Sequence, residues 1–219
     1  MPFDVSPPRD CQACPRLAQF RAKNRAEHPD WRNEPVESWG RSDARLLIVG
    51  LAPGLRGANR TGRPFTGDFA GDLLYETLLA YGFAKGVYRA RPDDGLDLVD
   101  CAIVNAVRCV PPQNKPTPQE IATCRPYLVE AIVALKALEA IVALGRIAHE
   151  SVLRAQGIGL SALPFAHGAA HPLPSGAVLF DSYHCSRYNT NTGVLTQKMF
   201  ADVFAAARGH LTRKARPAG

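Results

Sequence analysis

Four short runs of mostly apolar or β-branched residues constrain the fold of this chain more than any other feature. They cover residues 45–51, 102–107, 140–144 and 177–182. Mostly apolar runs of this length are typical of strands buried on both faces, and the segments between them are long enough to hold crossover helices. The pattern predicts an α/β fold, a three-layer α/β/α arrangement with a central, mainly parallel four-stranded sheet.

Helix signals stand between and after these runs. Residues 69–81 are amphipathic and precede Gly82, and Thr117-Pro118-Gln119-Glu120 combines a capping box with a proline in the first turn. Two more helical patterns follow, at 146–156 and 193–208. In such sheets functional groups lie on loops beyond the carboxyl ends of the strands, so candidate residues are expected in the segments that follow the four runs.

The length of the chain fits one domain. With 219 residues, of which 46% are hydrophobic and 21% charged, the composition excludes disordered, collagen-like and coiled-coil classes. We expect a single domain over 1–219, in which residues 1–42, rich in proline and charge, form a docked N-terminal arm. The basic tail, 209–219, is expected to be flexible.

Net charge and targeting signals bear on what the protein binds and where it acts. The chain has 26 Lys and Arg against 20 Asp and Glu, a net charge of +6 that favours a polyanionic partner. Its first ten residues carry prolines and acids where a secretion signal would be apolar, and charged residues interrupt the most apolar stretch, 127–144. We expect a cytoplasmic protein that does not span a membrane.

The cysteines suggest a metal site. Cys11 and Cys14 form a pair with ligand-type spacing, and Cys109 and Cys124 flank a proline-rich loop and a helix start that could bring their thiols together. Four converging thiolates would suit either zinc or a [4Fe–4S] cluster, and spacing does not choose between them. The alternative to a metal site is that the Cys11–Cys14 spacing arose by chance and that the other thiols are small buried side chains. Cys101 and Cys185 are expected to be core or site-lining residues and not ligands.

The loop after the first strand, residues 50–68, contains five glycines. It lacks the spacing of a P-loop or a dinucleotide fold, which disfavours nucleoside triphosphate and nicotinamide cofactors. Glycines let a backbone approach a ligand closely, and three arginines of the loop could meet phosphates; these are Arg56, Arg60 and Arg63. Phe65 is either a plug under the loop or an aromatic platform, and Asp68 either a helix N-cap or a functional carboxylate.

Two further strand ends carry polar residues. Asn105 stands inside a buried apolar strand, where its amide must be paired either with backbone or with a ligand such as the edge of a nucleobase. His184 stands at the root of the polar loop after the last strand. A single histidine is more often structural, but an aromatic face, an amide and an imidazole at one sheet edge predict a pocket for a planar heterocycle.

Several motifs in order resemble the uracil-DNA glycosylase superfamily, and specifically its cluster-containing family 5, the type B enzymes. They are Cys11-x2-Cys14, the Gly-Leu-Ala-Pro-Gly motif running to Phe65-Thr66-Gly67-Asp68, Asn105-Ala106-Val107-Arg108-Cys109 with Cys124, and the segment 184–191. The resemblance implies that Cys11, Cys14, Cys109 and Cys124 hold a [4Fe–4S] cluster. It also implies that Phe65 stacks on a flipped base, Asn105 binds its edge, and His184 donates to its oxygen.

Other roles follow from the same resemblance and its departures. Gly50 and Ala52 are expected in the base pocket, and Ala52 replaces the polar residue by which many relatives direct water. That role passes to Asp68, with Asp72 in reserve. Cys185 stands where relatives usually have proline and would loosen the loop, and Tyr188 stands at the position that wedges into the base stack. The expected DNA contacts are Arg56, Arg60, Arg63, Arg187, Tyr188 and Asn189.

The resemblance predicts a monofunctional DNA glycosylase of base excision repair. It would excise uracil and other deaminated or damaged bases from duplex and single-stranded DNA, as a monomer, without a lysine nucleophile. One alternative is a non-catalytic iron–sulfur protein that binds nucleic acid, in which Asp68 is only a cap and His184 a core residue. An electron-transfer module is disfavoured because the chain has ligands for one cluster only and lacks the sequence signature of a flavin or nicotinamide site.

Overall fold

The computed structural model describes residues 5–214, whose central sheet has the strand order β1-β5-β2-β6-β8-β7. The four predicted strands are confirmed as parallel neighbours at its centre. Almost all of their residues are buried, which explains the mostly apolar runs in the sequence. They are β2 (Leu46–Gly50), β5 (Cys101–Asn105), β6 (Ala140–Leu144) and β8 (Val178–Ser182).

The sheet has six strands, not the predicted four. Short antiparallel strands add to its edges: β1 (Trp39–Gly40) pairs with β5, and β7 (Ala170–Pro172) with β8. Neither has an apolar run, because two or three partly exposed residues at an edge bury no face of their own. A separate hairpin of β3 (Ala84–Lys85) and β4 (Asp97–Leu98) lies outside this sheet.

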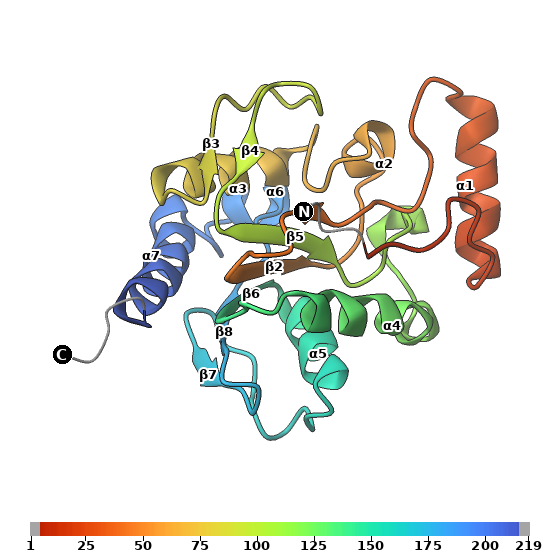
Figure 1. The fold of residues 1–219 in the computed structure, drawn as a ribbon. Coiled ribbons are helices and arrows are strands. Elements are labelled where there is room, and N and C mark those ends of the chain that lie inside the picture. Colours follow the sequence, from red (N-terminus) through yellow and green to blue (C-terminus); the bar gives the residue numbers. More distant parts are fainter. Residues whose placement is uncertain (1–4, 215–219) are drawn as a thin grey trace.

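Helices cover both faces of the sheet, as predicted (Figure 1). Alternate strand residues face opposite ways, so one face packs against α3 (Phe69–Ala80) and α7 (Gln197–Lys214). The other packs against α4 (Pro118–Ala134) and α5 (Arg146–Ala155). The capping box of α4 is present in both directions, since the Thr117 hydroxyl accepts from the Glu120 amide and the Glu120 carboxylate accepts from the Thr117 amide. None of the helices within residues 5–214 is long and apolar enough to cross a bilayer.

The N-terminal arm contains a helix that the sequence pattern did not reveal, α1 (Pro15–Glu27). Two of its four buried residues are Arg21 and Asn24, so the buried side has no apolar period to detect. The other two are Leu17 and Ala18. Of the predicted arm, residues 1–4 lie outside the described part of the chain.

The predicted flexible tail is wrong for its first six residues. Helix α7 continues to Lys214, and Leu211 is fully buried while its carbonyl accepts a hydrogen bond of 2.7 Å from the Arg45 guanidinium. Residues 215–219 lie outside the described range. Two short helices, α2 (Ala58–Thr61) and α6 (Arg187–Asn191), and the turn η1 (Pro112–Asn114) lie in the loops at the carboxyl ends of the strands.

Candidate active site

A pocket of about 390 Å³ opens at the carboxyl ends of β2, β5 and β8. This is the edge where a parallel sheet places its functional loops. The pocket gathers most of the pocket residues expected from the sequence, and Arg187, expected as a DNA contact, lines it too. The expected pocket residues are Ala52, Phe65, Asp68, Asn105 and His184. Gly50 lies directly behind this lining, paired with Asn105 in the β2–β5 register.

Asn105 lines this pocket and carries an unsatisfied hydrogen-bond acceptor. Its side chain is only 2% exposed, and its Oδ1 has no hydrogen-bond partner among the described residues. A buried amide oxygen without a donor is costly, typically about 1–3 kcal/mol. Because Asn105 lines the pocket, a ligand with an N–H group in its plane would satisfy that oxygen.

Phe65 is both buried under the loop and part of the pocket wall. Its backbone is in the left-handed region, with φ of +51°, an uncommon conformation for a bulky residue. The hydroxyls of Tyr75 and Tyr88 support this turn by donating to the carbonyls of Pro64 and Phe65 respectively. The ring centroid of Phe65 lies 6.4 Å from that of His184, with 32° between the ring planes. The two readings of Phe65 from sequence are therefore compatible.

His184 brings an imidazole to the opposite side of the same pocket. Within residues 5–214 its ring nitrogens have no hydrogen-bond partner, and burial lowers its pKa below the ordinary histidine value. The ring is therefore neutral at pH 7 and has an N–H to donate. The Asn189 amide donates to the His184 carbonyl at 2.8 Å, so Asn189 positions this loop from α6.

Asp68 caps α3 and also faces the pocket. Its Oδ1 accepts from the Gly71 amide at 3.3 Å, and its carboxylate lies against the backbone of Gly54 and Gly57, where a β-carbon would collide with it. Burial raises the pKa of this carboxyl. The reserve candidate, Asp72, is exposed and does not line the pocket.

Asn114 is a pocket residue that the sequence reasoning missed. It belongs to η1 in the proline-rich loop, where Gln113 and Asn114 both adopt positive φ, +56° and +57°. Asparagine tolerates that conformation better than most residues. The signal that could have revealed it is its place in the loop that follows β5, beyond the carboxyl end of a central strand.

Exposed basic and aromatic residues surround the opening. Arg56 and Arg60 are exposed on the loop after β2. Arg187 is exposed on α6, where its guanidinium lies 5.3 Å from the ring centroid of Phe69. Tyr188, next to it, is 74% exposed, an unusual placement for a large aromatic side chain.

Arg63 does not belong to this set, contrary to the prediction that it contacts DNA. Its side chain is 6% exposed, and both terminal nitrogens bind the carboxylate of Asp94 at 2.8 Å. Its Nε donates to Thr66, and its guanidinium lies 4.8 Å from the ring centroid of Trp39. The pair holds the pKa of Asp94 well below its usual range. Arg63 thus anchors the loop internally, where its buried guanidinium is paired with Asp94 and not exposed to a phosphate.

The four cysteines predicted as ligands line one cavity between α1, the loop after β5, and α4. The buried Arg21 guanidinium donates to Cys109 Sγ at 3.2 Å, and the Arg108 amide donates to Cys124 Sγ at 3.4 Å. Burial raises the pKa of the Cys109 thiol to about 12. Four thiols with buried donors fit a four-thiolate metal centre. Cys101 and Cys185 are buried elsewhere, and the Cys185 thiol donates to the Ala70 carbonyl.

The chain is similar to proteins of one family. The family model described as the Uracil DNA glycosylase superfamily matches residues 37–208. A type-5 uracil-DNA glycosylase of Thermus thermophilus is 44% identical over 203 residues, 90% of this chain and 92% of the relative. Proteins of the same description from Mycobacterium leprae (44% identical, 90% of each chain) and Pyrobaculum aerophilum (38% identical, 90% and 88%) match as well.

Proposed function

Because the chain belongs to the uracil-DNA glycosylase superfamily, we propose that it removes uracil from DNA by hydrolysing the N-glycosidic bond, the first step of base excision repair. The observation that carries this proposal is the unpaired, buried Oδ1 of Asn105 at the pocket between Phe65 and His184. The pocket has the shape and the groups that a flat base requires.

The three groups match the chemistry of uracil. Its imide N–H donates to Oδ1 of Asn105, and its face stacks on Phe65. Cytosine would place a ring-nitrogen lone pair against that oxygen, leaving the buried acceptor unpaired. Other deaminated bases carry a comparable N–H, and the apolar Ala52 adds no polar group that would reject them.

His184 and Asp68 divide the chemical work. Cleavage leaves negative charge on the base and an oxocarbenium-like sugar. The neutral His184 donates its N–H to the base oxygen as charge develops there. The Asp68 carboxylate, held by its cap bond to α3, orients water and stabilises the sugar, and the amide of Asn114 is a second group that can hold the water.

DNA engages the exposed groups around the opening. Arg56, Arg60 and Arg187 pair with phosphates, and Tyr188 fills the space that a flipped base leaves in the duplex. A single strand needs no wedge, so replacing Tyr188 with alanine should slow cleavage of duplex more than cleavage of single strands. All of these groups come from one chain, so the proposed DNA contacts require no second copy, which suits a monomer.

Cys11, Cys14, Cys109 and Cys124 would hold a [4Fe–4S] cluster, which would tie α1 to the loop that carries Asn114. When bound, it supplies a structural cross-link. The buried guanidinium of Arg21 offsets the negative charge of the thiolates. Such thiolates persist in a reducing compartment, which agrees with action in the cytoplasm.

The competing function is binding without cleavage. In that case the cap bond would be the whole role of Asp68, and His184 would only fill the loop. The unpaired Asn105 oxygen supports base binding in both functions, and whether His184 and Asp68 then cut the bond is decided by the assay for abasic sites.

The two functions are separated by incubating the purified protein with a duplex that holds one uracil, followed by alkali. Strand cleavage reports an abasic site and supports the glycosylase, whereas binding without cleavage supports the alternative. Asn105→Ala should lose cleavage. Gln197→Ala, which removes an exposed amide on α7, is the matched control and should retain it.

A further inference from the structure

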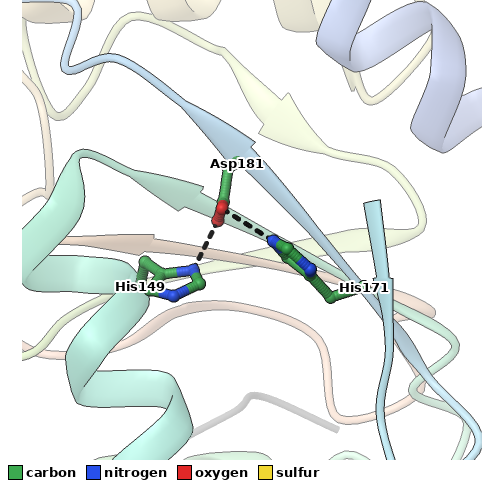
Figure 2. A group of neighbouring side chains, drawn as sticks. All are labelled: His149, His171 and Asp181. Carbon is green, nitrogen blue, oxygen red and sulfur yellow. Dashed lines mark hydrogen bonds and ion pairs between the residues drawn. The ribbon is translucent and has the colours of Figure 1, made fainter. Parts of the chain in front are cut away.

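A cluster of His149, His171 and Asp181 lies outside the candidate active site (Figure 2). Nδ1 of His149 is 2.7 Å from one carboxylate oxygen of Asp181, and Nε2 of His171 is 3.1 Å from the other. The side chains of His149 and Asp181 are 2% and 0% exposed, and that of His171 is 12% exposed. Neither the proposed glycosylase chemistry nor the cysteine site uses these residues.

The three residues lie within a segment of 33 residues, from His149 to Asp181, and the tertiary structure brings their side chains together. Asp181 stands on the central strand β8, and His171 stands on the edge strand β7, where its register partner is Leu179. His149 reaches the same place from α5, which packs on that face of the sheet. The cluster therefore joins one helix and two strands.

The hydrogen bonds of His149 leave a lone pair facing Asp181. Its Nε2 is 2.9 Å from the Leu163 carbonyl, which only accepts, so we assign the proton of a neutral ring to Nε2. Nδ1 then turns its lone pair toward the carboxylate, at 2.7 Å. Two acceptors at this separation need a cation between them, either an additional proton or a metal ion.

We propose that Nδ1 of His149, Nε2 of His171 and a carboxylate oxygen of Asp181 bind a zinc ion. The three ligand atoms all lie within 4.8 Å of one another. Two imidazoles and one carboxylate are a typical zinc donor set, and tetrahedral coordination requires ligand atoms about 3.3 Å apart, a small adjustment. Water completes the coordination on the side of His171, the one partly exposed member.

The groups behind the ligands suit a metal. A metal-bound histidine usually donates its other N–H to a carbonyl or carboxylate, and His149 does so to Leu163. The Ala166 amide donates to Oδ2 of Asp181 at 3.4 Å, which orients the carboxylate. The ring of Phe165 lies edge-on to His149, with centroids 5.6 Å apart, and limits solvent access.

Bound zinc would act as a structural clamp. It would hold β7 and the 157–169 loop against β8. Asp181 is near the end of β8, and His184 follows it by three residues in the chain. The metal lies outside the base pocket, so we assign it no step in base excision. Its expected effect is on stability.

The test uses the full chain with its cysteine site loaded with iron, confirmed by iron analysis, so that zinc cannot occupy those thiols. After passage over a chelating resin, the protein is titrated with zinc against a fluorescent chelator. Crystals grown with zinc are measured at the zinc and iron absorption edges. The variants are His171→Gln and Asp181→Asn, and His28→Gln is the control because His28 stacks on Trp31, away from the cluster.

We expect one zinc equivalent, affinity lower by about tenfold or more in His171→Gln and unchanged in His28→Gln, and a zinc-edge peak among the three side chains. Zinc should also raise the melting temperature of the wild type and not of His171→Gln. If Asp181→Asn does not fold, His171→Gln alone decides. No zinc binding, binding that His171→Gln leaves intact, or an iron-edge peak at this place would each overturn the assignment.

Discussion

A β-carbon on Gly50 would lie 2.6 Å from Cζ of Phe65, closer than any ordinary carbon contact. It would lie closer still to Oδ1 of Asn105. Glycine at the end of β2 therefore lets the ring and the amide meet at the base of one pocket. Its role is close approach, because its backbone φ is not in the left-handed region.

Gly50→Ala should displace Phe65 and Asn105 together. We expect the single-turnover rate on a uracil duplex to fall, and the free energy of unfolding to fall by about 1–3 kcal/mol from overpacking. Gly159→Ala is the control, since a β-carbon there meets nothing within 4 Å. Full activity in Gly50→Ala would contradict the close packing of these groups.

His184→Ala should lower the single-turnover rate by on the order of a hundredfold with little change in DNA affinity, because the lost donor acts mainly as charge develops. Burial lowers the pKa of His184, so any histidine step in the pH profile of the rate should fall below pH 6.5. A rate that changes through the ordinary histidine pKa, and does so only with His184 present, would contradict the neutral donor. His28→Ala serves as the control.

Asp68→Asn should slow the reaction with little change in melting temperature, since asparagine also caps helices. Burial raises the pKa of Asp68, so the wild-type rate should fall on acidification at a higher pH than for an exposed aspartate. Asp72→Asn is the control and should be active because Asp72 is exposed outside the pocket lining. If Asp68→Asn were active and Asp72→Asn were not, the catalytic carboxylate would be that of Asp72, one helical turn further on.

Arg21→Met should destabilise the proposed cluster, because Cys109 would lose its 3.2 Å donor and the thiolates a buried positive charge. We expect a faster loss of brown colour in air and less iron per chain. Lys23→Met, on the exposed side of the same helix, is the control. Colourless wild-type protein with stoichiometric zinc at the four cysteines would exclude the iron cluster itself.

Arg56 and Arg63 should respond differently to replacement by glutamine. Arg56→Gln should reduce the slope of log Kd against log salt by about one, as expected for a phosphate contact. Arg63→Gln should leave that slope unchanged and cost about 3–5 kcal/mol of stability, because it strands the buried carboxylate of Asp94. Salt titrations and denaturant unfolding of both variants measure the two effects.

Local signals in the sequence were sufficient for the centre of the fold. The four central strands and the capped start of α4 were predictable because burial on both faces demands an apolar run, and because Thr117 and Glu120 bond within one turn. The strands β1 and β7 and helix α1 were not. Strand β1 and helix α1 depend on partners far along the chain, whereas β7 pairs with the nearby β8 but is only three residues long and has no apolar run. The buried side of α1 even includes Arg21, whose partners are Cys11 and Cys109.

The candidate site shows the same division. The motifs around Phe65, Asn105 and His184 pointed to one pocket, because parallel strands end at the same edge of a sheet. Only the tertiary structure separated Arg63 from Arg56, since Asp94 lies 31 residues away and cannot be paired with Arg63 by inspection. It likewise brought His149, His171 and Asp181 together. Sequence determines interactions within a turn or a strand, and packing between distant elements decides which charged side chains are neutralised inside the protein and which remain to bind a ligand.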